Sequence, residues 1–173
     1  MNNLVLCGFM GCGKTTLAKS LSEKLNMPLI DTDEAIVKQE GRTVSEIFAS
    51  DGEAYFRRLE TELIARLSKT QGNIISLGGG LAANKQNHSY LKRAGIIILL
   101  DCGIKETLER ITGDGSRPLT AGGTDDITAR YNLRKPIYES VADVIIDSSG
   151  TTEQTLELAL EAIKNLKKGD LQC

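Results

Sequence analysis

Short runs of apolar residues alternate with longer amphipathic stretches along the chain. The runs are uniformly apolar and rich in β-branched residues, which is typical of strands buried on both faces. They occupy residues 4–7, 28–31, 74–77, 96–100 and 144–146. Because amphipathic stretches separate them, the pattern predicts a parallel sheet with helices on both faces, the doubly wound α/β class.

Two predicted helices carry clear local signals. Thr43 and Glu46 have the spacing of a capping box, in which each side chain binds the backbone of the other at a helix start. Near the C-terminus, an apolar stripe recurs at helical spacing. Its members are Leu156, Ala159, Leu160, Ile163 and Leu166.

Two segments interrupt the alternation of strands and helices. Residues 33–70 hold about three helical patterns, more than one crossover needs, and residues 113–126 are rich in glycine and polar residues. Without a repeat or a linker, residues 1–173 are predicted to form one domain. Ligands bind beyond the carboxyl ends of the strands in this class. We therefore expect about 33–60 to be a substrate-binding insertion and about 113–126 a lid.

Composition and charge narrow the function classes. Hydrophobic residues make up 40% and charged residues 25%, and the net charge of -2 leaves no basic excess for nucleic acid. No apolar run approaches the roughly 20 residues that span a bilayer. The N-terminus lacks the basic region of a signal peptide. We therefore expect neither a nucleic-acid nor a membrane partner, and a cytoplasmic location.

The cysteines indicate a reducing compartment. Cys7, Cys12, Cys102 and Cys173 have neither metal-like nor disulfide-like spacing, so we expect reduced thiols. Because His88 is the only histidine, a structural zinc site is not expected.

Residues 8–15 match G-x-x-x-x-G-K-[ST] in full, between a predicted strand and a predicted helix. Glycines let backbone N–H groups surround a phosphate, and the following helix adds its positive N-terminal end. Lys14 suits the β- and γ-phosphates, and the Thr15 hydroxyl suits Mg²⁺. The loop residues expected to contact ATP are Gly11, Cys12, Gly13, Lys14, Thr15 and Thr16.

The loop motif by itself does not separate a kinase from a GTP switch or an ATPase motor. A GTPase would need a guanine-reading N-K-x-D segment, which this chain lacks. A motor is usually larger. A compact chain with a lid and a helical insertion favours a kinase of small acceptors.

Asp31 and Asp33 follow the second predicted strand at a spacing of two. One carboxylate can serve the metal and the other the acceptor hydroxyl. The alternative is structural: Asp33 precedes a helical pattern and could be its N-cap. The spacing leaves both interpretations open.

Four further features are ambiguous when each is taken alone. Arg57 and Arg58 could be a solvated helix face, and residues 78–80 are three glycines that could be a tight turn or a close approach for a ligand. Arg117 lies in the predicted lid, and Arg134 lies beyond it.

Taken together and in order, these features resemble the shikimate kinase family. The matching elements are GFMGCGKTT, DTD, GRTVSEIFASDGEAYFRRLE, SLGGG, RPL and LRKPIY, spread from residue 4 to about residue 147. The resemblance implies a nucleoside-monophosphate-kinase-like P-loop fold with strand order 2-3-1-4-5. It also implies transfer of the γ-phosphate of ATP to the 3-hydroxyl of shikimate, on the route to chorismate and aromatic amino acids.

The resemblance also assigns roles near the reacting groups. Asp33 resembles the aspartate that binds the acceptor hydroxyls. Asp31 resembles the aspartate near Mg²⁺, where the Thr15 hydroxyl is also expected. Arg117 resembles a lid arginine that meets phosphate charge. Arg110 resembles a residue that packs near adenine.

For the substrate carboxylate, the resemblance points to Arg57 and Arg134, with Gly78, Gly79 and Gly80 lining the same pocket. A planar guanidinium binds a carboxylate bidentately, which suits two arginines to an anionic acceptor. The chain departs from the family at Cys12, where Ser or Ala is common. It also departs in residues 148–155, where adenine contacts cannot be assigned.

Asp101 could be mistaken for the metal-side acid, because it ends an apolar predicted strand as a Walker B aspartate does. The family pattern instead places the metal-side acid at Asp31. We expect Asp101 to cap the next helix or its preceding turn.

Two alternatives to this function remain open. One is another small-molecule kinase of the same architecture, acting on gluconate or a nucleoside monophosphate. The other is a sensor that binds nucleotide and ligand without turnover. For either kinase, ATP and a small acceptor would be the partners, Mg²⁺ the cofactor, and a monomer the expected state.

Overall fold

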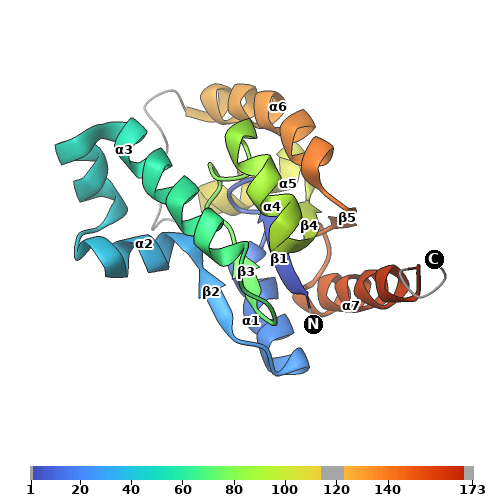
Figure 1. Ribbon diagram of the computed structural model, residues 1–173. Coiled ribbons are helices and arrows are strands. Elements are labelled where there is room, and N and C mark those ends of the chain that lie inside the picture. The colour runs from blue at the N-terminus through green and yellow to red at the C-terminus, as the bar shows by residue number, and fades with distance from the viewer. Residues whose placement is uncertain (1, 114–122, 170–173) are drawn as a thin grey trace.

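The structure, a computed structural model, describes residues 2–113 and 123–169 (Figure 1). Residues 114–122, which carry Arg117 and most of the predicted lid, lie outside the described residues, as does Cys173. The strands are β1 (Asn3–Gly8), β2 (Leu29–Asp31), β3 (Ile74–Ser76), β4 (Gly95–Asp101) and β5 (Val144–Asp147). The α-helices are α1 (Lys14–Leu25), α2 (Thr32–Glu40), α3 (Val44–Leu67), α4 (His88–Ala94), α5 (Gly103–Gly113), α6 (Gly123–Val141) and α7 (Thr152–Gly169), and η1 (Lys85–Asn87) is a 3-10 turn.

The strands form one parallel sheet in the order β2-β3-β1-β4-β5, as the family resemblance predicted. β1 is central and alternates its side chains between two cores. Val5 and Cys7 face one cluster, with α3, α4 and α6, while Leu4 and Leu6 face the other, with α1 and α7. Figure 1 shows these helices on the two faces of the sheet. The doubly wound prediction is confirmed.

The expectation that every strand is buried on both faces is wrong at the edges of the sheet. All three residues of β2 are only half-buried. In β5, Ile146 packs into the cluster with α7, whereas Ile145 is 53% exposed. An edge strand has a neighbour on one side only, so apolar composition does not guarantee burial there.

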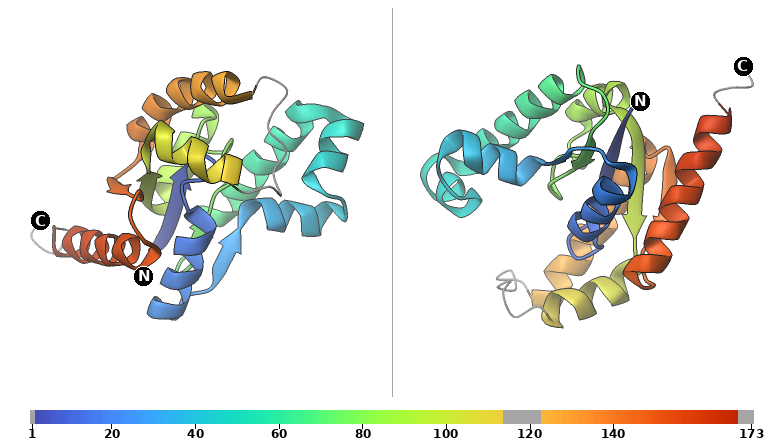
Figure 2. Two further views of the ribbon diagram at one scale, coloured as in Figure 1. Left: turned by 180° about the vertical axis from the view of Figure 1, so that it is seen from behind. Right: turned by 90° about the horizontal axis from the view of Figure 1, so that it is seen from below.

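The segment between β2 and β3 forms the predicted helical insertion. The capping box is present: Thr43 Oγ1 accepts from the Glu46 N–H at 3.2 Å, and Glu46 Oε2 accepts from the Thr43 N–H at 2.7 Å. Gly52, with φ 81° and ψ 169°, breaks α3 into two pieces. With α2 they make three helical pieces. Figure 2 shows α2 and the first part of α3 projecting away from the sheet.

Among the described helices, none is long and apolar enough to cross a membrane. Cys7, Cys12 and Cys102 are buried, free thiols.

Candidate active site

The loop between β1 and α1 has the backbone geometry of an anion-binding turn. Gly11 and Gly13 have φ values of 78° and 90°, which side-chain-bearing residues rarely adopt. Gly13 is the N-cap of α1 and has no side chain to offer, so the first N–H groups of the helix face the loop. The loop can therefore bind phosphate through its backbone.

Lys14 starts α1 and turns its ammonium group back over this loop. Its Nζ donates to the Gly8 carbonyl at 2.9 Å and the Phe9 carbonyl at 2.8 Å. The Cys12 Sγ, buried beneath the loop, lies 3.6 Å from the same Nζ. Lys14 thus places a positive charge beside the loop, at the wall of the cavity described next.

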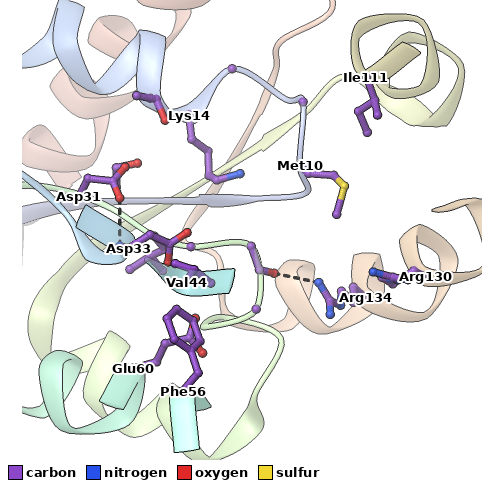
Figure 3. A pocket seen from close by; sticks show the side chains of 18 of the residues that line it. Met10, Lys14, Asp31, Asp33, Val44, Phe56, Glu60, Ile111, Arg130 and Arg134 are labelled. Carbon is purple, nitrogen blue, oxygen red and sulfur yellow. Dashed lines mark hydrogen bonds between the residues drawn. The ribbon is translucent and has the colours of Figure 1, made fainter. Parts of the chain in front are cut away.

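A cavity of about 500 Å³ joins the phosphate loop to the helical insertion and to α6 (Figure 3). It brings together most of the site residues predicted from the sequence. They are Gly11, Gly13, Lys14, Thr15, Thr16, Asp31, Asp33, Arg57, Gly78, Gly79, Gly80, Arg110 and Arg134. Cys12 instead lines a neighbouring cavity.

Asp31 and Asp33 occupy different positions at the start of α2. Asp31 is the N-cap, because its Oδ1 accepts from the N–H groups of Asp33 at 3.0 Å and Glu34 at 3.4 Å. The structural alternative considered for Asp33 is therefore wrong: the cap lies two residues earlier, and Asp33 is inside the first turn. Figure 3 shows both carboxylates beside Lys14.

Asp33 lines the cavity, and one of its two carboxylate oxygens is fully buried. Its Oδ1 is buried and has no hydrogen-bond partner among the described residues. Burial raises the pKa of Asp33, and the nearby Asp31 charge raises it further, while Lys14 and Arg57 oppose the shift. A buried carboxylate oxygen without a partner is costly unless a ligand satisfies it.

Arg57 is held from two sides on α3. Its Nη2 pairs with the exposed Glu53 at 2.7 Å, and its Nη1 pairs with Glu60 at 2.8 Å. Arg58 instead pairs loosely with Glu62 on a solvated face. The adjacent arginines are thereby separated into one that faces the cavity and one that faces water, as positions about 100° apart on a helix should be.

Glu60 is a cavity residue that the sequence reasoning did not select. It is 1% exposed, and its Oε1 has no partner among the described residues. Burial raises the pKa of Glu60 to about 7, although the hydrogen bond and charge of Arg57 oppose the shift. The signal was available: Glu60 lies three residues after Arg57, which places the two on one helix face.

Two of the three glycines after β3, Gly78 and Gly80, lie closely against side chains of the protein itself. A Cβ on Gly78 would lie 2.1 Å from Asp33 Oδ1, and one on Gly80 would lie 1.9 Å from Arg57 Nη1. The space beside these two glycines is therefore occupied by Asp33 and Arg57, and the close approach of a ligand stays a prediction. Gly79 contributes its carbonyl, which accepts from α6.

The helix α6 meets this turn through two residues one helical turn apart. Tyr138 donates to the Gly79 carbonyl at 2.6 Å, and Arg134 Nη1 donates to it at 3.3 Å. Arg130 also lines the cavity from α6 (Figure 3). Arg57 and Arg134 therefore reach one cavity from two different helices.

The neighbouring cavity, of about 240 Å³, lies on the other side of the phosphate loop. Arg110 separates the two: its Nη1 donates to the Gly11 carbonyl at 3.5 Å, and its Nη2 donates to the Ser148 carbonyl at 2.9 Å. Gly150, Thr152 and Thr155 also line this cavity. The structure thus brings Arg110 together with the 148–155 segment, whose contacts the sequence left unassigned.

Asp101 does not line the large cavity. Its Oδ1 accepts from the Gly103 N–H at 3.0 Å, which confirms the predicted role at the turn before α5. Its carboxylate also binds Tyr131 and Lys135, which the sequence did not indicate.

Residues 10–166 match a family model described as shikimate kinase. The chain belongs to the shikimate kinase family. A shikimate kinase from Caldicellulosiruptor bescii is 41% identical over 165 residues, covering 94% of each protein. The family resemblance read from the sequence is confirmed.

Two solved shikimate kinase structures have the same fold. The structure from Acinetobacter baumannii in complex with shikimate has a TM-score of 0.87 and 29% identity, and covers 99% of this chain and 96% of its own. The structure from Aquifex aeolicus has a TM-score of 0.86 and 34% identity, and covers 95% and 98%. The shared fold extends over nearly the whole of each chain, including the shikimate kinase elements around the cavity.

Proposed function

We propose that this chain transfers the γ-phosphate of ATP to the 3-hydroxyl of shikimate, giving shikimate 3-phosphate and ADP. The observation that carries the proposal is one cavity lined by a complete phosphate loop, a buried carboxylate and arginines from two helices. Shikimate offers one carboxylate and several hydroxyls, which match these groups. The relatives named shikimate kinase, one of them solved with shikimate, support the same conclusion.

Arg57 and Arg134 would bind the shikimate carboxylate. Each guanidinium presents a planar fork of donors, and such charge-assisted pairs are stronger and more directional than neutral hydrogen bonds. Glu60 and Glu53 hold Arg57, and the Gly79 carbonyl holds Arg134, so both forks are oriented before the substrate arrives. Gly78, Gly79 and Gly80 would form the wall beside the ring.

Asp33 would receive the proton of the reacting hydroxyl. Its raised pKa makes it a better base than an ordinary aspartate, and its side chain lines the cavity where the hydroxyl would lie. The hydroxyl oxygen then bonds to the γ-phosphorus as the bond to the ADP oxygen breaks. Lys14 would stabilise the phosphate charge during this transfer, which depends mainly on positioning and electrostatics.

The donors beside the loop fit Mg²⁺. Thr15 and Asp31 offer oxygen atoms in the cavity, and Mg²⁺ is commonly held by one or two carboxylates together with substrate phosphates. Among the described residues no cluster of three or more His, Cys, Asp or Glu forms a metal cage, which suits an ion held largely by ATP. When bound, Mg²⁺ would neutralise phosphate charge.

On the nucleotide side, Arg110 and the 148–155 segment would contact adenine in the smaller cavity. Arg117, outside the described residues, would meet phosphate charge from the lid. We propose that the working species is a monomer. Sedimentation at assay concentration tests that state, and a purely dimeric active species would contradict it.

A coupled assay of ADP release tests the function with shikimate, gluconate and AMP as acceptors. We expect turnover with shikimate and Mg·ATP well above the other two. Turnover of AMP or gluconate equal to that of shikimate would replace the proposal with one of its alternatives. ATP binding without turnover of any acceptor would favour a sensor.

A further inference from the structure

Three side chains outside the cavity form a polar cluster between the end of β4 and α6. Asp101 Oδ1 accepts from Tyr131 Oη at 2.7 Å, and Asp101 Oδ2 pairs with Lys135 Nζ at 2.5 Å. The Asp101 side chain is 19% exposed, and Tyr131 is 6% exposed. Burial tends to raise the pKa of Asp101, but the hydrogen bonds from Lys135 and Tyr131 hold it below its ordinary value. The carboxylate is therefore ionised and firmly bound.

Two neighbouring rows of side chains along α6 make different contacts: one row belongs to the polar cluster, and the other contacts the turn beside the cavity. Tyr131 and Lys135 lie one helical turn apart and bind β4, while Arg134 and Tyr138 lie one turn apart and bind the Gly79 carbonyl. Lys135 follows Arg134 directly, so the two rows are about 100° apart around the helix. With one row bound to the end of β4 and the other to the turn after β3, the rotation of α6 about its axis is determined.

The helix itself is weakest at this point. Pro136 lies inside α6, where it has no N–H to donate to the carbonyl four residues earlier. The turn without that bond contains both Arg134 and Lys135. Side-chain anchoring therefore has more influence on the direction of Arg134 than it would in an unbroken helix.

We propose that Asp101, Tyr131 and Lys135 are positioning residues that orient Arg134 toward the acceptor carboxylate. The proposal rests on the shikimate kinase function and on Arg134 as a carboxylate ligand. None of the three lines the large cavity, and Tyr131 and Lys135 lie on the same helix as Arg134. Loss of the cluster leaves Arg134 in place in the sequence but free to point away from the substrate.

The test compares Lys135→Met with a matched control, Lys92→Met. Lys92 Nζ pairs with Asp143 Oδ1 at 2.7 Å, and Asp143 also accepts from a backbone N–H, that of Ile97, as Asp101 does from Gly103. The control ion pair joins α4 to the residues before β5, and Lys92 does not line the large cavity. Both changes therefore remove an ion pair between a part-exposed lysine and a carboxylate, and Lys135→Met also removes a longer contact with Glu139, at 3.9 Å, within α6. Of the two lysines, Lys135 is the one that lies on α6.

We expect Lys135→Met to raise the KM for shikimate roughly tenfold, with kcat and the KM for ATP within about twofold of wild type, since a small misplacement of a binding group weakens binding strongly. Lys92→Met should only lower the melting temperature. Lys135→Arg keeps the positive charge and should therefore leave the KM for shikimate close to the wild-type value. In an Arg134→Lys background, Lys135→Met should add little, because the group it orients is already changed.

An unchanged shikimate KM in Lys135→Met would overturn the proposal, and so would a loss confined to kcat or an undiminished effect in the Arg134→Lys background. If Lys135→Met does not fold, Tyr131→Phe answers the question. It keeps the ring that packs edge-on against Phe9 at 5.4 Å and removes only the hydroxyl. A raised shikimate KM supports the proposal, and an unchanged one overturns it. Wild-type enzyme that does not use shikimate would instead reject the proposed function.

Discussion

Replacing Gly80 by alanine tests how closely the turn after β3 is matched to Arg57. The added Cβ would lie 1.9 Å from Arg57 Nη1, whereas ordinary contacts begin at 3.4 Å. The guanidinium must then withdraw by about 1.5 Å to reach normal van der Waals separation. Gly80 does not have a left-handed φ, so the backbone itself tolerates alanine. The perturbation therefore acts mainly on the end of one side chain.

The loss in shikimate binding follows from the contacts that a displaced Arg57 guanidinium would lose. Its 2.8 Å bond to Glu60 would lengthen or break, and its fork would leave the orientation proposed for the carboxylate. A charge-assisted hydrogen bond contributes about 1.5–3 kcal/mol, which corresponds to roughly a ten- to hundredfold loss in binding. We expect Gly80→Ala to raise the shikimate KM within that range and to leave the KM for ATP nearly unchanged.

A double-mutant cycle with Arg57→Ala isolates the mechanism. If Gly80→Ala acts by displacing Arg57, it should have little further effect on shikimate use once Arg57 is truncated. The assay is steady-state ADP release with variable shikimate, together with thermal melting of each variant. Additive effects of the two changes would show that the methyl group blocks the substrate directly, and a Gly80→Ala enzyme with wild-type KM would refute the reasoning altogether.

Three further outcomes are expected. Lys14→Met should lose most of kcat in the ADP-release assay while staying folded, because the phosphate charge loses its partner during transfer, and a near-normal kcat would exclude this loop. Asp31→Asn should remain folded, since Asn also caps helices, but its kcat should fall and its Mg²⁺ titration should change. Asp33→Asn should also lose kcat but should bind Mg·ATP normally. If the two variants show the opposite phenotypes, the roles of Asp31 and Asp33 are exchanged. The pKa of Glu60 is raised from 4.5 to about 7 in the folded state, so the folded protein binds the Glu60 proton more tightly than the unfolded chain does. This contribution to the free energy of unfolding is complete below pH 4.5, the pKa in the unfolded chain, and is lost as the pH rises to the folded-state pKa of about 7. Wild type should therefore lose unfolding free energy relative to Glu60→Gln between about pH 4.5 and 7, by about 1.4 kcal/mol per pH unit at most, and a flat difference in urea denaturation would contradict the shift.

Asp101 shows where local sequence patterns reach their limit. Its position at the end of β4 suggests a metal ligand, and its next neighbours suggest a turn. Both inferences use residues close in sequence. Its partners Tyr131 and Lys135 lie 30 and 34 residues away, and only the packing of α6 against the sheet brings them to the carboxylate.

The sequence by itself determined the strands, the phosphate loop, the helical insertion and the family, because these depend on periodicity and on contiguous motifs. Asp33 and Arg57 were ambiguous by spacing alone and could be selected only through the family resemblance. Only the tertiary structure decided that Asp31 and not Asp33 caps α2, that Glu60 lies buried beside Arg57, and that edge strands stay partly exposed. Those features depend on which surfaces meet when the chain folds. Burial, in particular, sets the pKa of Glu60 and Asp33, and it is a property of the surroundings, which the residue type does not encode.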